Sequence, residues 1–444
     1  MIHPSARLVD AETGRVVAGG ELSGLVAAAA DTLGAVRAPG PVFALTPTDV
    51  DGVVRYLGAF AARRAVALLD PALPALPGLV ERFAPAVVTG VRGAAPAGYR
   101  DANLPGLGPV WLRTGRDGVA PHPDLGLLLT TSGSTGNPKL VRLSRAAVRA
   151  NAAQIADSLG IDGAAVAPTT LPLFYTYGLS VLNSHLLRGA TVLLEREGLL
   201  RAGFWRAVDT HRATSLAAVP YQYEMLRRLR FDPAQHPSLT TLTQAGGRLH
   251  PDLVADFARR MGGNLYVMYG QTEATARMTV LPPARLADKP GSAGLPVPGG
   301  SLAVDGGEIV YTGPNVMMGY AESAADLARG DELGGVLRTG DLGHLDDEGF
   351  LFLTGRAKRI GKVFGVRVNL DDVERSLAAH GPVAAVAGDD RLRVFLEDGD
   401  PRAVRSELAA RLGTHVSGLD VRAVDRLPLL PTGKIDYRAL ESTA

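Results

Sequence analysis

Thr130-Thr131-Ser132-Gly133-Ser134-Thr135-Gly136-Asn137-Pro138-Lys139 is the most informative stretch of the chain. It follows the apolar run Leu125 to Leu129 and precedes a helix-like segment that begins near Ser144. A loop with four hydroxyl residues among the six residues from Thr131 to Gly136, two glycines and a lysine can offer backbone N–H groups, hydroxyls and a cation to a polyanion. We therefore predict that this loop binds phosphate.

The loop does not match the Walker A pattern G-x-x-x-x-G-K-[ST]. Pro138 rather than glycine precedes Lys139, and Leu140 rather than Ser or Thr follows it, so no hydroxyl stands after the lysine to hold Mg²⁺. A phosphate-loop NTPase is therefore excluded. The alternative of a Ser/Gly-rich linker without a ligand is disfavoured, because linkers seldom lie directly between a buried strand and a helix.

The composition is that of an ordinary globular protein and excludes several classes of function. The 444 residues are enough for two to three domains. A net charge of +1 gives no electrostatic reason to expect nucleic acid or a membrane as a partner, and the absence of cysteine excludes disulfides, Cys-ligated zinc and thiol catalysis. Because residues 1–20 show no signal pattern and no apolar stretch approaches about 20 residues, we expect a cytoplasmic location.

Residues 125–270 alternate short apolar runs with amphipathic segments, which predicts an α/β fold with helix-covered, mostly parallel sheets. In such sheets ligands bind at the carboxyl ends of strands, and the phosphate-binding loop directly follows one strand. The predicted strands are Leu125–Thr130, Ala165–Pro168, Ala190–Leu194, Thr214–Val219, Leu239–Gln244 and Leu265–Tyr269. The predicted helices are Ser144–Leu159, Gly178–Leu187, Phe204–His211, Tyr221–Arg230 and Pro251–Met261, with Ser144 as an N-cap and Gly160 as a C-terminal stop.

The character of the sequence changes twice after this region. From Val280 to Leu353 glycine and proline are frequent and apolar runs are short, as in a small β subdomain. After Gly355 a basic segment leads into a compact pattern of strands and helices. We therefore predict a large domain, residues 1–354, that includes the β subdomain, and a small α+β domain, residues 355–444.

Six further stretches, taken together with the loop, resemble a known family. They are Leu171–Gly178 (LPLFYTYG), Tyr269–Glu273 (YGQTE), Gly307–Gly313 (GEIVYTG), Arg338–Leu342 (RTGDL), Gly355–Lys358 (GRAK) and Leu429–Ile435 (LLPTGKI). In this order and at these spacings the chain resembles the adenylate-forming superfamily of acyl-CoA synthetases, carrier-protein adenylation domains and luciferases. The resemblance runs from about residue 125 to the C-terminus, whereas residues 1–120 match only loosely.

The resemblance implies ATP and Mg²⁺ as cofactors and a site for each part of the nucleotide. In this reaction a carboxylate attacks the α-phosphate of ATP and gives an acyl-adenylate and pyrophosphate, so two anions must be brought together by cations. Glu273 is implied as the Mg²⁺ ligand, Thr272 as a contact of the α-phosphate, and Asp341 as the acceptor of both ribose hydroxyls. The other implied nucleotide or phosphate contacts are Thr131, Ser132, Ser134, Thr135, Lys139, Gly246, Tyr269, Gly270 and Arg356.

Lys434, in Pro-Thr-Gly-Lys-Ile, is implied as the catalytic lysine of adenylation. It would neutralise the charge that develops at the α-phosphate. Lys358 takes the hinge position, at which the family rotates the small domain between the two half-reactions. Gly361 and the pair Asn369-Leu370 depart from the family pattern, so the identity of the second half-reaction stays open.

The resemblance also places an acyl pocket along the chain, lined by Tyr175, Thr176, Tyr177, Tyr221, Gly247 and Met268. Thr176 stands where adenylation domains for α-amino acids commonly carry an Asp that pairs with the ammonium group. A buried ammonium without a carboxylate is costly, so a standard α-amino acid is disfavoured. The tyrosines favour a small aryl or hydroxylated acid over a long fatty chain.

The leading hypothesis is an AMP-forming acid–thiol ligase that activates a small carboxylic acid with ATP. The acyl acceptor would be the thiol of CoA or of a carrier-protein phosphopantetheine. Two alternatives stay open: an amide-bond synthetase that transfers the acyl group to an amine, and a non-catalytic nucleotide-binding sensor. The sequence also leaves the oligomeric state open.

Overall fold

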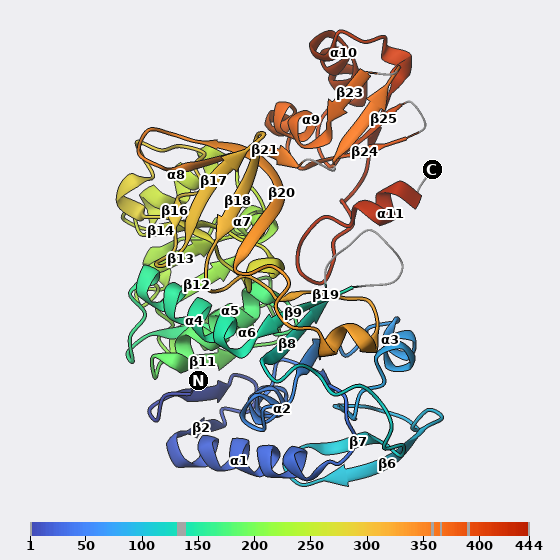
Figure 1. Cartoon of the computed structure of the whole chain (residues 1–444). Helices are drawn as coiled ribbons and strands as arrows, with labels where there is room; N and C mark the ends of the chain where they lie inside the picture. The colour runs from blue at the N-terminus through green and yellow to red at the C-terminus, as the bar shows by residue number, and fades with distance from the viewer. Residues whose placement is uncertain (1, 131–138, 357–358, 365, 389–390, 443–444) are drawn as a thin grey trace.

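The computed structural model describes residues 2–130, 139–356, 359–364, 366–388 and 391–442. Most of the chain forms a broad body of sheets and helices, coloured from blue through yellow to light orange in Figure 1, and the last part of the chain forms a smaller unit above it, coloured orange to red. The predicted class is confirmed, since the chain is a mixed α/β protein with several sheets.

An eight-stranded sheet, ordered β19-β9-β8-β4-β3-β5-β7-β6, carries the phosphate-binding stretch. Its central strands pair in parallel and are almost entirely buried, as expected for apolar runs covered on both faces. These are β3 (Val42–Leu45), β4 (Val66–Leu69), β5 (Val87–Thr89) and β8 (Leu125–Thr130). Antiparallel strands lie at both edges: β6 (Tyr99–Leu104) and β7 (Gly108–Arg113) at one, β9 (Leu140–Ser144) and β19 (Gly319–Ala321) at the other.

The structure corrects one expectation about the phosphate-binding stretch, which does not lead straight into a helix. Strand β9 comes after it and pairs antiparallel with β8, and α4 (Arg145–Leu159) begins only then. Because the charged Arg142 lies in the middle of this short strand, the segment has no continuous apolar run, and the sequence pattern did not predict a strand here. The helix ends are as predicted: the Ser144 hydroxyl accepts a hydrogen bond from the Ala147 N–H at 2.9 Å, and Gly160 has a φ of +63°.

Two further sheets follow in the large body. The first is a five-stranded sheet in which β12 (Ser215–Ala218), β13 (Thr241–Gln244) and β14 (Leu265–Tyr269) are parallel, and β15 (Thr279–Leu281) and β16 (Leu295–Pro296) are antiparallel. The second contains β10 (Val166–Pro168), β11 (Thr191–Leu194), β1 (Arg7–Asp10) and β2 (Val16–Ala18). The helices of the large body are α1 (Gly19–Ala35), α2 (Val50–Ala61), α3 (Leu76–Phe83), α4, α5 (Thr176–Leu187), α6 (Ala202–Thr210), α7 (Pro220–Arg228) and α8 (Pro251–Arg260).

The predicted β subdomain is an antiparallel sheet of four strands. They are β17 (Ser301–Asp305), β18 (Glu308–Thr312), β20 (Val336–Leu345) and β21 (Leu351–Arg356), in that order across the sheet. Asp341 in β20 lies opposite Arg356 at the end of β21. This pairing places Asp341, the predicted acceptor of the ribose hydroxyls, beside the start of the C-terminal unit.

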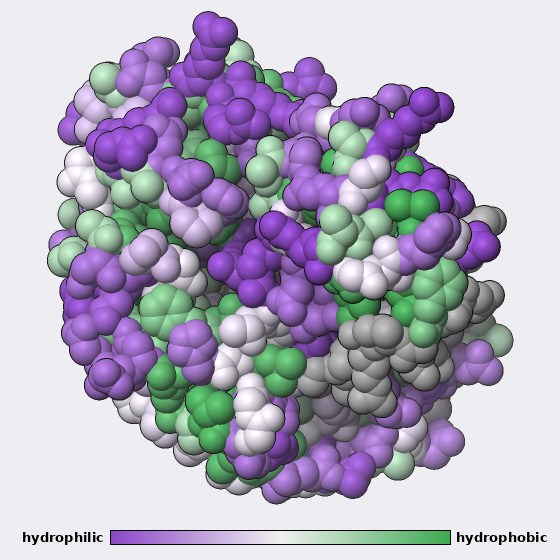
Figure 2. Space-filling view, turned by 90° about the horizontal axis from the view of Figure 1, so that it is seen from above, coloured by the Kyte–Doolittle hydropathy of each residue, from purple (hydrophilic) through white to green (hydrophobic). Residues whose placement is uncertain are grey.

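The C-terminal unit has a hydrophobic core of its own, which includes Val373, Leu377, Val394 and Leu408. Seen from above, this end of the molecule is largely hydrophilic, with apolar residues in small separate groups (Figure 2). No helix in the described part of the chain is long and apolar enough to cross a membrane. The elements of the unit are β22 (Ile360–Val363), β23 (Val366–Asn369), α9 (Leu370–Ser376), β24 (Val383–Ala387), β25 (Leu392–Leu396), α10 (Pro401–Leu412), β26 (Leu419–Ala423) and α11 (Tyr437–Ser442).

Arg142 ties strand β9 to the segment that carries β19. It is fully buried, and its guanidinium donates to the carbonyl oxygens of Tyr320 and Met318 at 3.1 Å each, of Arg329 at 2.5 Å and of Gly330 at 3.2 Å. It also forms an ion pair with Glu332. A buried charge with this many acceptors is satisfied, and its removal would leave the acceptors without donors.

We expect Arg142→Met to lower the free energy of unfolding by about 3 kcal/mol, because it leaves buried carbonyl groups unpaired. Arg338→Met is the matched control, since Arg338 is an exposed arginine paired with Asp305 and Glu308 on the surface; its effect should stay within about 0.5 kcal/mol. Thermal unfolding of both variants measures the difference. Equal midpoints would contradict the structural role of Arg142.

Candidate active site

Asp341 is the centre of the predicted nucleotide site, and both of its carboxylate oxygens accept hydrogen bonds. Oδ2 accepts from the Tyr269 hydroxyl at 2.5 Å and from Gln271 Nε2 at 2.6 Å, and Oδ1 accepts from Arg356 Nε at 2.9 Å. The Asp341 side chain is only 4% exposed. Burial, and then the negative charge of Asp341, raise the pKa of Tyr269 well above its usual value, so the phenol stays a donor. Donors therefore hold this carboxylate in one orientation, with oxygens suited to a vicinal diol.

The Thr-Gly-Asp stretch orients Asp341 through its backbone. Gly340 has a φ of +71°, which favours glycine, and its N–H donates to Glu308 Oε1 at 2.9 Å. The Thr339 hydroxyl accepts from the Asp341 N–H at 3.1 Å and donates to the Ile309 carbonyl at 2.8 Å. Strand β18 thus holds the turn that presents the carboxylate.

Glu273, the predicted Mg²⁺ ligand, lies in a short 3₁₀ turn, Thr272–Ala274, directly after β14. Its Oε1 accepts a hydrogen bond from the Tyr320 hydroxyl at 2.8 Å. Gly270 allows the chain to turn here, because a Cβ at this position would lie 1.7 Å from the Ala276 carbonyl oxygen. Thr272, beside Glu273, begins this turn three residues after Tyr269, the last residue of β14.

A single carboxylate suits Mg²⁺ at this place. Within the described ranges, no group of three or more His, Asp or Glu side chains could form a metal cage of protein ligands. Mg²⁺ in nucleotide sites is usually held by one or two carboxylates together with the phosphates of the substrate. Glu273 fits that arrangement, in which the nucleotide supplies most of the ligands.

Tyr320 is a residue that the sequence motifs missed. Its ring lies 5.9 Å from Lys139 Nζ, and Lys139 also forms an ion pair with Glu322. Tyr320 reaches this place because β19 pairs with β9, which puts it opposite Val141. One side chain therefore contacts both the predicted phosphate lysine and the predicted metal ligand.

Five predicted residues lie outside the described residues. They are Thr131, Ser132, Ser134 and Thr135 of the phosphate-binding stretch and the hinge residue Lys358. Their roles stay predictions.

Lys434 lies on a loop of the C-terminal unit that reaches the large body. The Leu430 N–H donates to the Lys434 carbonyl at 2.8 Å, and Gly433, with a φ of +75°, has no room for a Cβ because Val219 Cγ2 would lie 2.8 Å away. Lys434 Nζ lies 5.4 Å from the centre of the Tyr175 ring. A Cβ on Gly246 would lie 2.7 Å from the Tyr175 hydroxyl and 3.9 Å from Lys434 Cε. Glycine at 246 therefore leaves the space in which these two side chains converge.

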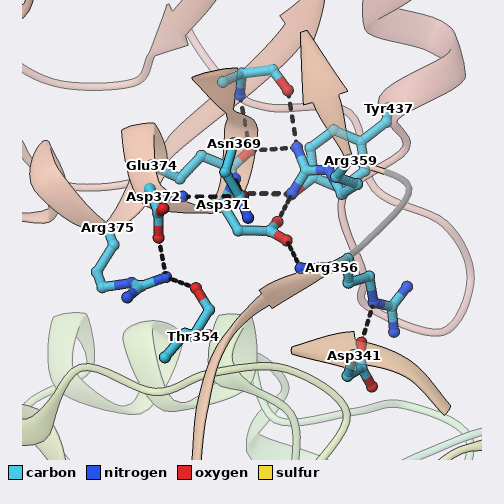
Figure 3. A network of polar contacts seen from close by, with 11 residues as sticks. Asp341, Thr354, Arg356, Arg359, Asn369, Asp371, Asp372, Glu374, Arg375 and Tyr437 are labelled. Atoms are coloured by element: carbon cyan, nitrogen blue, oxygen red, sulfur yellow. Dashed lines mark hydrogen bonds and ion pairs between the residues drawn. The ribbon is translucent and has the colours of Figure 1, made fainter. Parts of the chain in front are cut away.

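The electrostatic surroundings of Lys434 include the other predicted site residues. Burial, and then the positive charge of Arg356, lower the pKa of Lys434 to about 8, and the carboxylates of Glu273 and Asp341 oppose that shift. The structure therefore brings Lys434 into one neighbourhood with Glu273, Asp341 and Arg356. Figure 3 shows Arg356 between Asp341 and Asp371, whose Oδ2 accepts from the Arg356 N–H at 2.9 Å.

The predicted acyl-pocket residues divide into two groups. Tyr175, Tyr177 and Met268 belong to one buried cluster, in which the two tyrosine rings meet edge to face at 6.4 Å. The Thr176 hydroxyl is buried and donates to the Thr275 carbonyl at 2.6 Å. Gly247 is exposed, and the Tyr221 ring lies 5.9 Å from Arg426 Cζ. The cluster around Tyr175 is the part that adjoins Lys434.

The comparison with known families agrees with this geometry. The family described as AMP-binding enzyme matches residues 80–321, more than half of the 444 residues. The chain belongs to the AMP-binding enzymes. The resemblance to the adenylate-forming superfamily is thereby confirmed.

Curated relatives of this AMP-binding enzyme are acid–CoA ligases. An indoleacetate–CoA ligase from Aromatoleum aromaticum is 34% identical over 72% of this chain and 68% of its own length. An oxalate–CoA ligase from Arabidopsis thaliana is 29% identical over 90% of this chain and 88% of its own. The predicted class of enzyme is confirmed: the protein is an AMP-forming acid–thiol ligase.

Solved structures show the same fold. ATP-bound MatB from Rhodopseudomonas palustris has a TM-score of 0.79 at 22% identity and covers all of this chain and 96% of its own. The o-succinylbenzoate CoA synthetase of Bacillus subtilis, in complex with its acyl-adenylate, has a TM-score of 0.77 at 22% identity and covers 98% of this chain and 94% of its own. Another structure of the B. subtilis enzyme holds ATP and a magnesium ion.

The lowered pKa of Lys434 predicts a pH dependence for adenylation. If the ammonium is the active form, kcat/KM for the acid should fall as the pH rises through about 8, where the lysine loses its proton. The Lys434→Arg variant carries a guanidinium that stays charged to about pH 12. Its kcat/KM should therefore be lower than that of the wild type but should not fall as the pH rises through about 8. Pyrophosphate exchange between pH 6.5 and 9.5 measures both profiles. If kcat/KM of the arginine variant falls over the same pH range, the decrease must come from the titration of another group.

Proposed function

We propose that this protein activates a small carboxylic acid with ATP and transfers the acyl group to CoA. The observation that carries the proposal is the position of Lys434 Nζ, 5.4 Å from the centre of the Tyr175 ring and within the electrostatic influence of Glu273 and Asp341, which come from distant segments of the sequence. The relatives that are CoA ligases for indoleacetate, 2-succinylbenzoate and ferulate support CoA as the acceptor.

Each predicted residue has a task in the first half-reaction. The Asp341 carboxylate accepts the ribose hydroxyls, and Tyr269 lies against the base. Lys434 attracts the substrate carboxylate to the α-phosphate and stabilises the extra negative charge of the transition state. Lys139 and the hydroxyls of the phosphate-binding stretch hold the pyrophosphate that leaves. Mg²⁺, held by Glu273 and the phosphates, would neutralise part of the charge that repels the incoming carboxylate.

The second half-reaction requires Lys434 to leave and a thiol to enter. We place the hinge for this movement at Lys358, between a large domain of residues 1–354 and a small domain of residues 355–444. The Lys434 loop contacts the large body through Val219 and Tyr175, so rotation of the small domain would withdraw the lysine. The site would then be open to the phosphopantetheine thiol of CoA.

Lys434→Ala should fold normally but lose ATP–pyrophosphate exchange by about 10²–10³-fold, because a preorganised charge at the transition state is removed. Lys289→Ala is the control, since Lys289 forms ion pairs with Asp346 and Glu348, which lie between β20 and β21 and are not among the predicted site residues. The control should keep its exchange rate. Exchange at the wild-type rate in Lys434→Ala would overturn the assignment.

Mass spectrometry of the products identifies the acceptor. The wild-type protein, ATP and an accepted acid are incubated separately with CoA, with a phosphopantetheinylated carrier protein and with a panel of amines. Acyl-CoA is the expected product. If a product forms only with the carrier protein or only with an amine, that acceptor would replace CoA in the proposal. If the protein binds nucleotide but shows no ATP–pyrophosphate exchange with any acid, it would be a sensor.

A further inference from the structure

Arg277 is a buried arginine beside the predicted acyl pocket. It follows the turn that carries Glu273, and its side chain is only 2% exposed. Its backbone is held by Asn151, which donates from Nδ2 to the Arg277 carbonyl at 2.9 Å. The guanidinium carbon lies 4.8 Å from the centre of the Tyr177 ring.

The guanidinium of Arg277 lacks the partners that such burial requires. Among the residues that the structure describes, its Nε and Nη1 have no hydrogen-bond partner, and no carboxylate oxygen lies within 4.0 Å of it. Buried polar atoms are nearly always hydrogen-bonded, and buried charges are nearly always paired. Arg142 illustrates the usual case, since it is equally buried but donates to four carbonyl groups and pairs with Glu332.

The side chains around Arg277 supply no negative charge. His185 Nδ1 lies 2.8 Å from the Val181 carbonyl oxygen, and burial holds the pKa of His185 at about 4, so the imidazole is neutral. The Tyr177 hydroxyl donates to the Thr243 carbonyl at 3.0 Å, and burial raises its pKa, so the phenol is neutral too. His185 Nε2 and the Tyr223 hydroxyl are also buried without partners in the described part of the chain. Several polar groups in this region are thus left unsatisfied together.

The position of Arg277 relative to Lys434 shows which part of a substrate it could meet. Lys434 lies against the Tyr175 ring, Tyr175 meets Tyr177 edge to face, and Arg277 lies against the Tyr177 ring. Lys434 is therefore next to one of two neighbouring aromatic rings, and Arg277 is next to the other. A substrate with its reacting carboxylate at Lys434 would extend along the tyrosines toward Arg277.

We propose that Arg277 binds a second carboxylate at the far end of the substrate, so that the acid activated here is a small dicarboxylic acid. This inference rests on the proposed function, and it narrows the small-acid class to acids that carry two anionic groups. Arg277 would act as a specificity residue, because a carboxylate can pair with its guanidinium in two parallel hydrogen bonds. An acid without that group would leave the buried cation unpaired.

The first experiment compares acids that differ only in the second charge. Malonate, succinate, glutarate and phthalate are each tested against their monomethyl esters in ATP–pyrophosphate exchange with the wild-type protein. At least one diacid should exceed its half-ester in kcat/KM by on the order of 100-fold, the loss expected when one member of a buried charge pair is removed. Exchange only with half-esters or other monoacids would overturn the role of Arg277 and leave the proposed function intact. No exchange with any acid would instead count against the proposed function.

The second experiment separates recognition from support of the fold. In Arg277→Met, kcat/KM for the preferred diacid should fall on the order of 100-fold and that for its half-ester less than tenfold. Arg277→Lys should restore part of the preference, since it keeps the charge but loses the paired geometry. Because an unpaired buried charge is replaced by an apolar side chain, the melting temperature of Arg277→Met should not fall. A lower melting temperature together with equal losses for diacid and half-ester would show a structural role only and overturn the proposal.

Discussion

The site depends on the placement of one ammonium group, that of Lys434, against a body built by the rest of the chain. Moving a charge out of water is unfavourable, and the positive charge of Arg356 adds to that cost. The carboxylates of Glu273 and Asp341 offset part of it. Two glycines, Gly433 and Gly246, make the close approach sterically feasible. The other residues of the site serve to position these four charged side chains, those of Lys434, Arg356, Glu273 and Asp341.

Asp341 links the predicted nucleotide site to the C-terminal unit. It accepts from Tyr269 and Gln271 at the end of β14 and from Arg356 at the start of the C-terminal unit. Beyond Arg356, Figure 3 shows Arg359 bonded to Asp371 and Glu374, and Arg375 bonded to Asp372 and Thr354. A change in how the small unit sits would therefore act on Asp341, the predicted acceptor of the ribose hydroxyls, through Arg356, which also bonds to Asp371. This coupling gives a physical reason for nucleotide occupancy and domain position to depend on each other.

The sequence predicted those parts of the fold in which local pattern and packing agree. Strands β8 and β12 to β14 and helices α4 to α8 lie within a few residues of their predicted bounds, because each has an apolar face or run of its own. Strand β9 and the β6–β7 hairpin were missed, since short edge strands with polar residues depend on partners distant in the chain. Similarly, the motifs predicted Glu273, Asp341 and Lys434 as site residues. Tyr320 and Arg277 lie outside the motifs, and only their contacts with distant segments place them near the site.

The two ends of the predicted acyl pocket differ in how their charges are balanced, and in our proposal that difference constrains the substrate. At one end the ammonium of Lys434 shares its surroundings with two carboxylates and Arg356, so the protein itself balances much of the charge. At the other end Arg277 lies among neutral tyrosines and a neutral histidine. A fold that satisfies Arg142 with five acceptors has the means to satisfy a buried arginine. In our proposal the partner of Arg277 arrives with the ligand, which would pair both cations at once and make the second charge a condition of tight binding.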